Sequence, residues 1–366
     1  MLVQPVVMPG SGVWSWTVLG DDDVPVGPVE RFLAYLTDIQ RSPNTVKAYA
    51  HDLKDFWEFL GHRGLDWREA RLEDVGEFVA WLRLPPPVRE GAVAVLPSAV
   101  PQVGAATINR KLAAVSAFYA HQTRNGAYAG DLLAAWRAGG RGGWKPFLHH
   151  ISKGTPHRGR AITLKTDKKL PRILAVAEMQ AILDACVRLR DRFFFALLHE
   201  TGCRAGEALG LRHEDIAAAE CEIAVVPRDN ANRARAKSGP RVIPVGPELI
   251  RLYADYLHGE YGGIDSSYVF VNLFAAPRGH AWSYPAVYDL VSRLRAKTGI
   301  DFDPHWFRHS MATRLLRDGT PIEVVSKLLG HSSVTITLAI YGHLTAEDAR
   351  AALAKAGWFT GREVTW

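Results

Sequence analysis

The sequence is poor in the residues that mark exported and metal-bound proteins. It has three cysteines among 366 residues, an odd number without the spacing of a zinc site, which favours a reduced, intracellular setting. No run of ~18 apolar residues is present, so no transmembrane helix is predicted. The first sixteen residues lack a basic segment followed by a long apolar core. We therefore expect no signal peptide, no membrane contact and a cytoplasmic protein.

Two further absences restrict the chemistry. The chain has no G-x-x-x-x-G-K-[ST] loop for nucleotide phosphates, and no acidic cluster suited to two-metal catalysis. His305 and His309 have the spacing of a zinc-binding helix, but Trp306 stands where the H-E-x-x-H pattern has glutamate. We expect neither a metal nor a cofactor.

What the chain does have is a large apolar fraction and a basic excess. Hydrophobic residues make up 48% of the chain, which excludes wholesale disorder. A length of 366 residues exceeds what one core comfortably serves, so we expect two domains. The formal net charge of +6 leans toward a polyanionic partner.

The pattern of helical segments and breaks predicts the domain organisation. Ser42 and Pro43 form a cap and a first-turn proline for the helical segment "SPNTVKAYAHDLKDFWEFL". "VWSWTVLGDDDVPV" has two apolar runs around a Gly-Asp turn, which predicts a hairpin. We expect an N-terminal extension with this hairpin at 1–28, a helical domain at 29–137, a basic linker at 138–175 and a second domain at 176–366.

The second domain is predicted to be helical around a few strands. A long helix is expected over 176–202, ending at a glycine, followed by strands within 221–246 joined by a polar turn. The fold class is therefore mainly α with a small antiparallel β-sheet. Further helices are expected at Pro247–Tyr261, Tyr284–Lys297, Pro304–Asp318, Pro321–Leu329, Val334–Gly342 and from Thr345 onward.

The linker is rich in glycine and basic residues, and Asp167 is its only acid. It is either a solvated tether or a strap that lies along phosphates. Arg110 and Lys111, ahead of a helical face, are likewise either solvated charges or DNA contacts. The basic linker residues that we expect to contact DNA are Lys153, Arg158, Arg160, Lys165, Lys168 and Lys169.

Two polar positions are not demanded by packing. Glu207 follows Arg204 at a spacing of one helical turn, so the carboxylate can hold the guanidinium, either as a surface ion pair or within a site. Lys237 falls in a turn between two candidate strands, either as an ordinary turn lysine or as a functional group.

Two further segments carry polar side chains on, or just before, a predicted helix. His305 and Arg308 share one helix face. His331 follows Gly330, and Tyr341 closes a short apolar helix. These last two are either a cap and a core tyrosine, or reactive groups.

Taken together, these side chains have one chemical logic. Arginines bind a phosphodiester and stabilise its five-coordinate transition state. A tyrosine hydroxyl can attack the phosphorus and form a covalent ester. Ionising a tyrosine at pH 7 costs about 4 kcal/mol, which cations and a histidine can offset. A lysine can protonate the departing sugar oxygen.

At this point the sequence resembles the tyrosine recombinase (phage integrase) family. "SPNTVKAYAHDLKDFWEFL" is similar to the start of its helical core-binding domain. "TGCRAGEALGL", "PHWFRHSMATRLL" and "LLGHSSVTITLAIYGHL" are similar to its three catalytic boxes, in family order. The joint occurrence is specific, whereas no single box would be.

The resemblance implies a role for each matching residue. Tyr341 would be the nucleophile that forms a 3′-phosphotyrosine and frees a 5′-hydroxyl. The implied partners are Arg204 and Arg308 as a phosphate clamp, His305 as proton acceptor or hydrogen-bond partner of the tyrosine, His331 as donor to a non-bridging oxygen, Glu207 as support for the first arginine, and Lys237 as general acid.

The resemblance also implies an assembly. A SAM-like core-binding domain and an α/β catalytic domain would form a C-shaped clamp on double-stranded DNA, and four subunits would act on two sites, with an accessory directionality factor among the partners. A C-terminal helix would pack on a neighbouring subunit or on its own domain. The Pro-rich loop at 85–101 and the long linker favour an integrase or transposase of a mobile element, acting at the nucleoid.

Two alternatives remain at this stage. A type IB-like topoisomerase would use the same side chains as a monomer. A noncatalytic DNA-binding regulator would use 321–341 as a helix-turn-helix.

Overall fold

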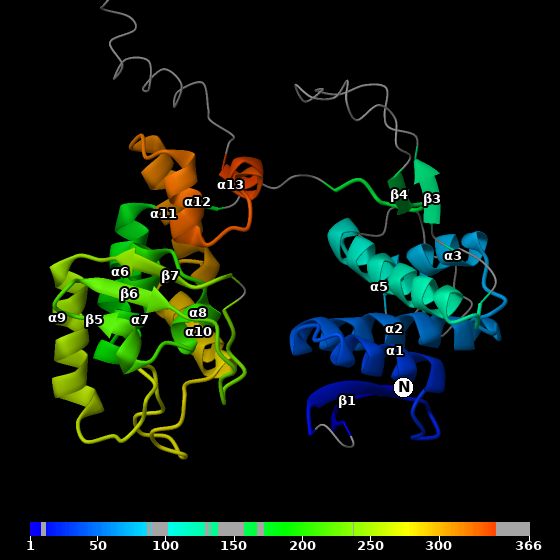
Figure 1. Ribbon diagram of the computed structural model, residues 1–366, viewed down its shortest axis with the longest axis horizontal. Helices are drawn as coiled ribbons and strands as arrows, with labels where there is room; N and C mark the ends of the chain where they lie inside the picture. Colours follow the sequence, from blue (N-terminus) through cyan, green and yellow to red (C-terminus); the bar gives the residue numbers. More distant parts are fainter. Residues whose placement is uncertain are drawn as a thin grey trace, which may run out of the picture. The chain divides into compact units, whose positions relative to one another are not determined.

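Helix boundaries in the first part of the chain follow its proline and glycine signals. The computed structural model, shown in Figure 1, describes residues 1–8, 12–85, 89, 102–128, 132, 134–137, 157–166, 172–236 and 238–341. The predicted cap is confirmed, because Ser42 Oγ accepts a hydrogen bond from the Thr45 backbone N–H at 3.2 Å and Pro43 begins the helix. The helices of this part are α1 (Gly27–Asp38), α2 (Pro43–Arg63), α3 (Leu72–Arg83) and α5 (Ala105–Arg124).

An N-terminal hairpin packs against α2, but its turn is not the predicted one. β1 (Leu2–Val7) pairs antiparallel with β2 (Trp14–Leu19), so the loop lies before β2. The Gly-Asp turn after β2 forms only an isolated bridge between Leu19 and Pro25. The sequence correctly predicted a Gly-Asp turn after β2 but not the strand that pairs with β2. That strand is β1, whose sequence "LVQPVV" lacks the strict alternation that marks a half-buried strand.

The chain divides into two units at a point inside the predicted linker. Unit 1 is Met1–Lys168 and unit 2 is Lys169–Trp366. Leu164 belongs to the core of unit 1, where the Asn109 side chain makes hydrogen bonds of 2.8 and 2.9 Å to its backbone. Two short strands, β3 (Ala134–Arg137) and β4 (His157–Arg160), pair antiparallel in the same unit.

Unit 2 begins with a break that the sequence did not predict. The expected long helix over 176–202 is two helices, α6 (Val176–Ala185) and α7 (Leu189–Thr201). Cys186 adopts an extended conformation and ends α6, and its backbone N–H donates to the carbonyl of Leu183 at 3.2 Å. Arg192 Nε on α7 donates to the same carbonyl at 3.2 Å. No glycine or proline in the sequence marks this break.

The remaining elements of unit 2 follow the prediction closely. A sheet of order β5-β6-β7 is antiparallel throughout, with Val225 opposite Arg241. The elements are α8 (Ala205–Leu209), β5 (Ile216–Ala217), β6 (Glu222–Val225), β7 (Arg241–Pro244), α9 (Pro247–Tyr256) with a π turn at Leu257–Tyr261, α10 (Tyr284–Thr298), α11 (Pro304–Arg317), α12 (Ile322–Leu329) and α13 (Val334–Tyr341).

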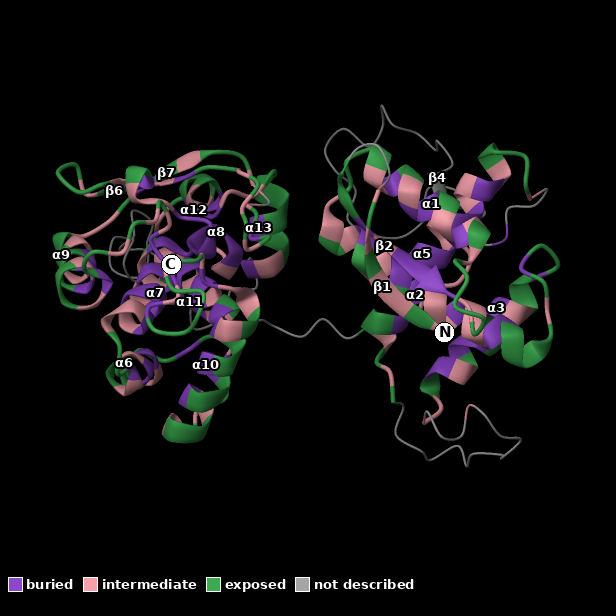
Figure 2. Ribbon diagram, turned by 90° about the horizontal axis from the view of Figure 1, so that it is seen from below, coloured by how far each residue is buried: buried purple, intermediate pink, exposed green. Residues whose placement is uncertain are grey.

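The core of unit 2 is built around α7. Its three consecutive phenylalanines, Phe193, Phe194 and Phe195, are fully buried because α6, α8, α9 and α11 surround the helix. Figure 2 shows the buried residues concentrated on these central helices. The three C-terminal helices α11, α12 and α13 gather at one end of the unit, and β7 packs against α12 (Figure 1). That end carries the candidate site.

The architecture confirms the mainly helical class with small antiparallel sheets. No single helix among the described residues is long and apolar enough to cross a membrane, while α12 and α13 reach that length only as a pair bent by 104°. The helix expected from Thr345 onward lies outside the described residues.

Candidate active site

Five of the predicted site residues line one cleft of about 860 Å³. They come from the start of α8, from α11, from the turn after α12 and from the end of α13. Chain segments separated by more than a hundred residues therefore present their polar groups to the same space. The five residues are Arg204, His305, Arg308, His331 and Tyr341.

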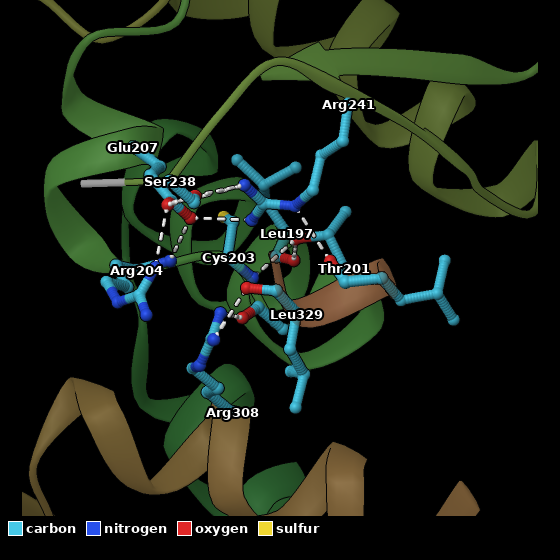
Figure 3. Close-up of polar contacts among 11 residues, drawn as sticks. Leu197, Thr201, Cys203, Arg204, Glu207, Ser238, Arg241, Arg308 and Leu329 are labelled. Atoms are coloured by element: carbon cyan, nitrogen blue, oxygen red, sulfur yellow. Dashed lines mark hydrogen bonds and ion pairs between the residues drawn. The ribbon is translucent and has the colours of Figure 1, made fainter. Parts of the chain in front are cut away.

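Arg308 is buried between the C-terminal ends of two helices. Its Nη1 donates to the carbonyl of Gly202 at 2.7 Å, and its Nη2 donates to the carbonyl of Leu329 at 2.6 Å (Figure 3). Helix C-termini carry partial negative charge, which stabilises a guanidinium there. Burial, with the nearby charge of Arg204, lowers the pKa of Arg308 to about 10, so it remains cationic at pH 7. These bonds use two of its five N–H donors.

Arg204 is held by the acid three residues further on. Its Nη1 donates to Glu207 Oε1 at 3.0 Å, and its backbone N–H donates to Oε2 at 2.9 Å. The same carboxylate accepts from Ser238 Oγ at 2.8 Å and from Arg241 Nη2 at 2.7 Å (Figure 3). Arg241 in turn donates through Nε to the carbonyl of Leu328 at 2.7 Å. One buried acid thus connects α8, the strand β7 and the end of α12.

The charge state of Glu207 follows from this network. Burial of its side chain raises its pKa, but the hydrogen bonds and charge of Arg241, the N–H of Arg204 and the hydroxyl of Ser238 outweigh burial and lower it to about 2. Glu207 is therefore ionised at neutral pH and balances part of the positive charge of the two arginines beside it.

The tyrosine hydroxyl lies against a histidine. Tyr341 Oη is 2.7 Å from Nδ1 of His309, and the ring of His305 packs edge-on against His309 with 4.4 Å between ring centroids. Burial raises the pKa of Tyr341 to about 12, although Arg308 and Arg204 oppose the rise. Burial, with the charges of His305 and Arg308, lowers the pKa of His309 to about 4. The ring is neutral at pH 7 and the phenol keeps its proton.

His331 stands at the opposite end of α13 from the tyrosine. Its Nδ1 is 2.8 Å from Oγ1 of Thr337, whose side chain is buried. Burial, with the charges of Arg308 and Arg204, lowers the pKa of His331 to about 4. The neutral ring carries one N–H, and a Thr337 hydroxyl that donates to Nδ1 leaves that N–H on Nε2.

Of the other predicted residues, Lys237 lies outside the described part of the chain and precedes Ser238 in the sequence. Lys327, in the last turn of α12, lines the cleft and was not predicted. Lys111 is buried in unit 1, where its ammonium contacts Asp52 and Asp55, a placement that fits a structural ion pair rather than a phosphate contact.

The basic linker is only partly described. Lys165 is exposed, and Arg110 is half exposed while paired with Asp52. Arg158 and Arg160 lie on β4, whose side chains are not described. Lys153, Lys168 and Lys169 lie outside the described residues. Among those described, no group of three or more His, Cys, Asp or Glu side chains is placed to hold a metal ion.

Sequence reasoning missed His309, Arg241 and Thr337. His309 entered only as half of a zinc-like pair, yet it follows Arg308 directly and so had to lie near the site. Arg241 and Thr337 carried no signal, because their partners lie 34 and 6 residues away and are set by tertiary packing.

Comparison with known proteins identifies the family of the chain. Residues 168–348 match the model of the phage integrase family, and residues 29–126 match the N-terminal SAM-like domain of phage integrases. Transposase A from transposon Tn554 of Staphylococcus aureus is 38% identical over 328 residues, with 89% of each chain covered. Tyrosine recombinase XerC of Roseiflexus castenholzii is 27% identical over 337 residues, covering 88% of this chain and 90% of the other.

Solved structures show the same fold. The Tn1549 transposon integrase in complex with transposon right end DNA has a TM-score of 0.59 at 18% identity, covering 90% of this chain and 99% of that one. A lambda integrase dimer bound to a core site has a TM-score of 0.56 at 15% identity, covering 86% of this chain and 76% of that one. The chain belongs to the phage integrase family of tyrosine recombinases, enzymes that cleave and rejoin DNA.

Proposed function

We propose that this chain is the integrase or transposase of a mobile element, and that it exchanges strands of double-stranded DNA through a covalent bond to Tyr341. The observation that carries the proposal is the convergence of two arginines, two histidines and a tyrosine on one cleft. The relationship to a transposon-encoded protein at 38% identity supports the mobile-element assignment.

The proposed step has a simple balance. Tyr341 Oη gives up its proton to a histidine of the cleft and attacks the scissile phosphorus, so that the Oη–P bond forms and the P–O5′ bond breaks. The departing O5′ takes a proton from a general acid, for which Lys237 is our candidate. Attack by a 5′-hydroxyl reverses the step and frees the tyrosine. The two ester bonds are alike in energy, so the reaction needs no nucleotide.

The remaining side chains act on the phosphate or hold the groups that do. Arg204 and Arg308 clamp its non-bridging oxygens and stabilise the charge of the transition state. His331 donates a further hydrogen bond through Nε2, and His305 supports the tyrosine side of the cleft. Glu207 keeps Arg204 in place and limits the repulsion between the two guanidinium groups.

We further propose that four copies act on two DNA sites, as a C-shaped clamp on each, with an accessory directionality factor. Arg110 on α5, together with Lys165 and the other basic residues of the linker, are our candidates for phosphate contacts. The protein would then act in the cytoplasm at the nucleoid, where its substrate lies.

Trapping of a covalent adduct tests the proposal. The full chain is incubated with a nicked duplex of its element end, so that the short released strand diffuses away and cleavage becomes irreversible. Wild type is expected to form a DNA adduct that survives denaturing electrophoresis, and Tyr341→Phe is expected to bind the duplex and form none. Binding by both proteins without any adduct would show a noncatalytic DNA-binding protein instead.

A further inference from the structure

The hydroxyl of Tyr341 already has a hydrogen-bond partner, and that partner is His309. The distance of 2.7 Å between Oη and Nδ1 is that of a full hydrogen bond. His309 lies on α11 directly after Arg308, whose guanidinium is fixed by two carbonyls. The imidazole therefore lies beside a residue that joins α11 to the ends of α7 and α12.

The direction of this hydrogen bond follows from the tautomer of His309. His309 is neutral at pH 7 and Tyr341 is protonated. In the tautomer with the ring N–H on Nε2, Nδ1 carries a lone pair and Oη–H donates to it. A lone pair is then aimed at the proton that must leave the phenol when its oxygen attacks. This is the geometry required of a general base.

His305 has a different relationship to the tyrosine. It is exposed, and its ring meets that of His309 edge-on at an angle of 76°. Such contacts are favourable between rings and restrict rotation of the more buried one. His305 thereby helps to fix the plane of His309.

Building on the proposed function, we propose that His309, rather than His305, holds the hydroxyl of Tyr341 and accepts its proton during attack on the phosphate. The proton moves from Oη to Nδ1 as the Oη–P bond forms and the P–O5′ bond breaks. During rejoining the same proton returns from Nδ1 to Oη as the 5′-oxygen displaces the tyrosine. His309 is thus a catalytic residue on the nucleophile side of the reaction.

A pair of substrates separates the nucleophile side from the leaving-group side. One nicked duplex has the natural oxygen at the 5′-bridging position of the scissile phosphate, and the other has sulfur. A thiolate leaves without being protonated, so the sulfur substrate no longer needs a general acid but still needs activation of the tyrosine. Single-turnover adduct formation is measured on both with wild type, His309→Ala, His309→Gln and Lys237→Ala.

We expect His309→Ala to slow adduct formation about 100-fold or more on both substrates, the usual contribution of general base catalysis. His309→Gln keeps a hydrogen-bonding side chain of similar reach but is no base, so it is expected to be slow on both as well. Lys237→Ala is expected to be slow on oxygen and restored on sulfur. Binding of the uncleaved duplex with the wild-type dissociation constant shows that a variant is folded, and His309→Gln serves if His309→Ala fails this check.

Four results would overturn the inference while leaving the proposed function intact. Three of them concern the His309 variants. They are cleavage by both His309 variants at the wild-type rate, and a wild-type rate of adduct formation by His309→Ala on the sulfur substrate. The third is a wild-type rate for His309→Gln alone, which would show that His309 only positions the tyrosine. A matched His305→Gln variant that loses more than His309→Gln on both substrates would assign the base to His305. Failure of wild type to form any adduct would instead contradict the proposed function itself.

Discussion

At the scale of single residues, Glu207 and Arg241 show how a buried charge pair sets the site. Glu207 is fully buried and Arg241 is nearly so, and the carboxylate is shared between Arg241 and Arg204, the proposed phosphate clamp. Removing one member of such a pair leaves the other buried and uncompensated, which costs about 3–5 kcal/mol, whereas removing both costs much less.

Arg241→Met is therefore expected to lower the free energy of unfolding at pH 7 by about 3 kcal/mol. The double variant Arg241→Met with Glu207→Gln is expected to recover much of that loss. Urea unfolding of the full chain measures both. A double variant as unstable as the single one would show that packing, and not charge, is the main contribution of Arg241.

The same pair predicts a pH dependence. The pKa of Glu207 in the folded chain is about 2, below its ordinary value of 4.5, so its ionised form stabilises the fold above pH 4.5. This stability is lost progressively as the pH falls from about 4.5 toward 2. We expect the urea midpoint of wild type to fall more steeply over this range than that of the double variant. Parallel pH profiles would contradict the assignment.

Thr337 belongs to this scale as a positioning residue for His331. Thr337→Val keeps the buried shape but removes the hydroxyl at Nδ1, so the ring N–H is no longer confined to Nε2. We expect adduct formation to slow about tenfold, the effect of one hydrogen bond of about 1.4 kcal/mol, with DNA binding unchanged. Thr335→Val, at an exposed position of the same helix, is the control and is expected to cleave at the wild-type rate.

At the scale of elements, Gly330 ends α12 with φ +65° and lies against the strand that carries Arg241. A Cβ there would come within 2.8 Å of Ser238 and 2.9 Å of Arg241 Nη1. We expect Gly330→Ala to lose more than about 1 kcal/mol of stability and to slow cleavage, because it separates β7 from the turn that carries His331.

Gly299 provides the matched control. It ends α10 with φ +71°, and a Cβ there meets nothing within 4 Å. Gly299→Ala therefore carries the backbone strain without the collision. Thermal unfolding and single-turnover cleavage compare the two variants, and equal losses of activity would refute the proposed contact.

The elements also show what the sequence could and could not predict. Pro43 and Pro304 begin helices where expected, because local signals decide such ends. The break at Cys186 had no local signal, since no glycine or proline lies there and the Leu183 carbonyl accepts from both Cys186 N–H and Arg192 Nε. The cleft followed the same division. The spacing of the motifs predicted Arg204 and Arg308 as site residues. The contact between His309 and Tyr341 could not be predicted in this way, because it spans 32 residues and depends on how α11 packs against α13.

At the scale of the whole molecule, the two units have separate hydrophobic cores. A fragment of residues 169–366 is therefore expected to fold and to form the tyrosine adduct at high concentration. It should bind the duplex at least about tenfold more weakly than the full chain and with a smaller dependence on salt, because it lacks the phosphate contacts that we propose for unit 1.

Binding at two salt concentrations, with a cooperative melting transition as the check on folding, tests this expectation. The same affinity and the same salt dependence as the full chain would mean that unit 1 makes no phosphate contacts on that duplex.

The buried position of Arg308 between two helix ends has a consequence for how proteins of this kind lose activity during evolution. Its guanidinium joins the ends of α7 and α12, so a chain that loses this arginine loses the joint between two helices along with its chemistry. Homologues that are inactive but still fold stably should therefore retain Arg308. Their inactivating substitution should lie elsewhere, most simply at Tyr341. In a homologue that has lost other site residues, a retained Arg308 would indicate an intact fold. It would say little about whether that homologue still cleaves DNA.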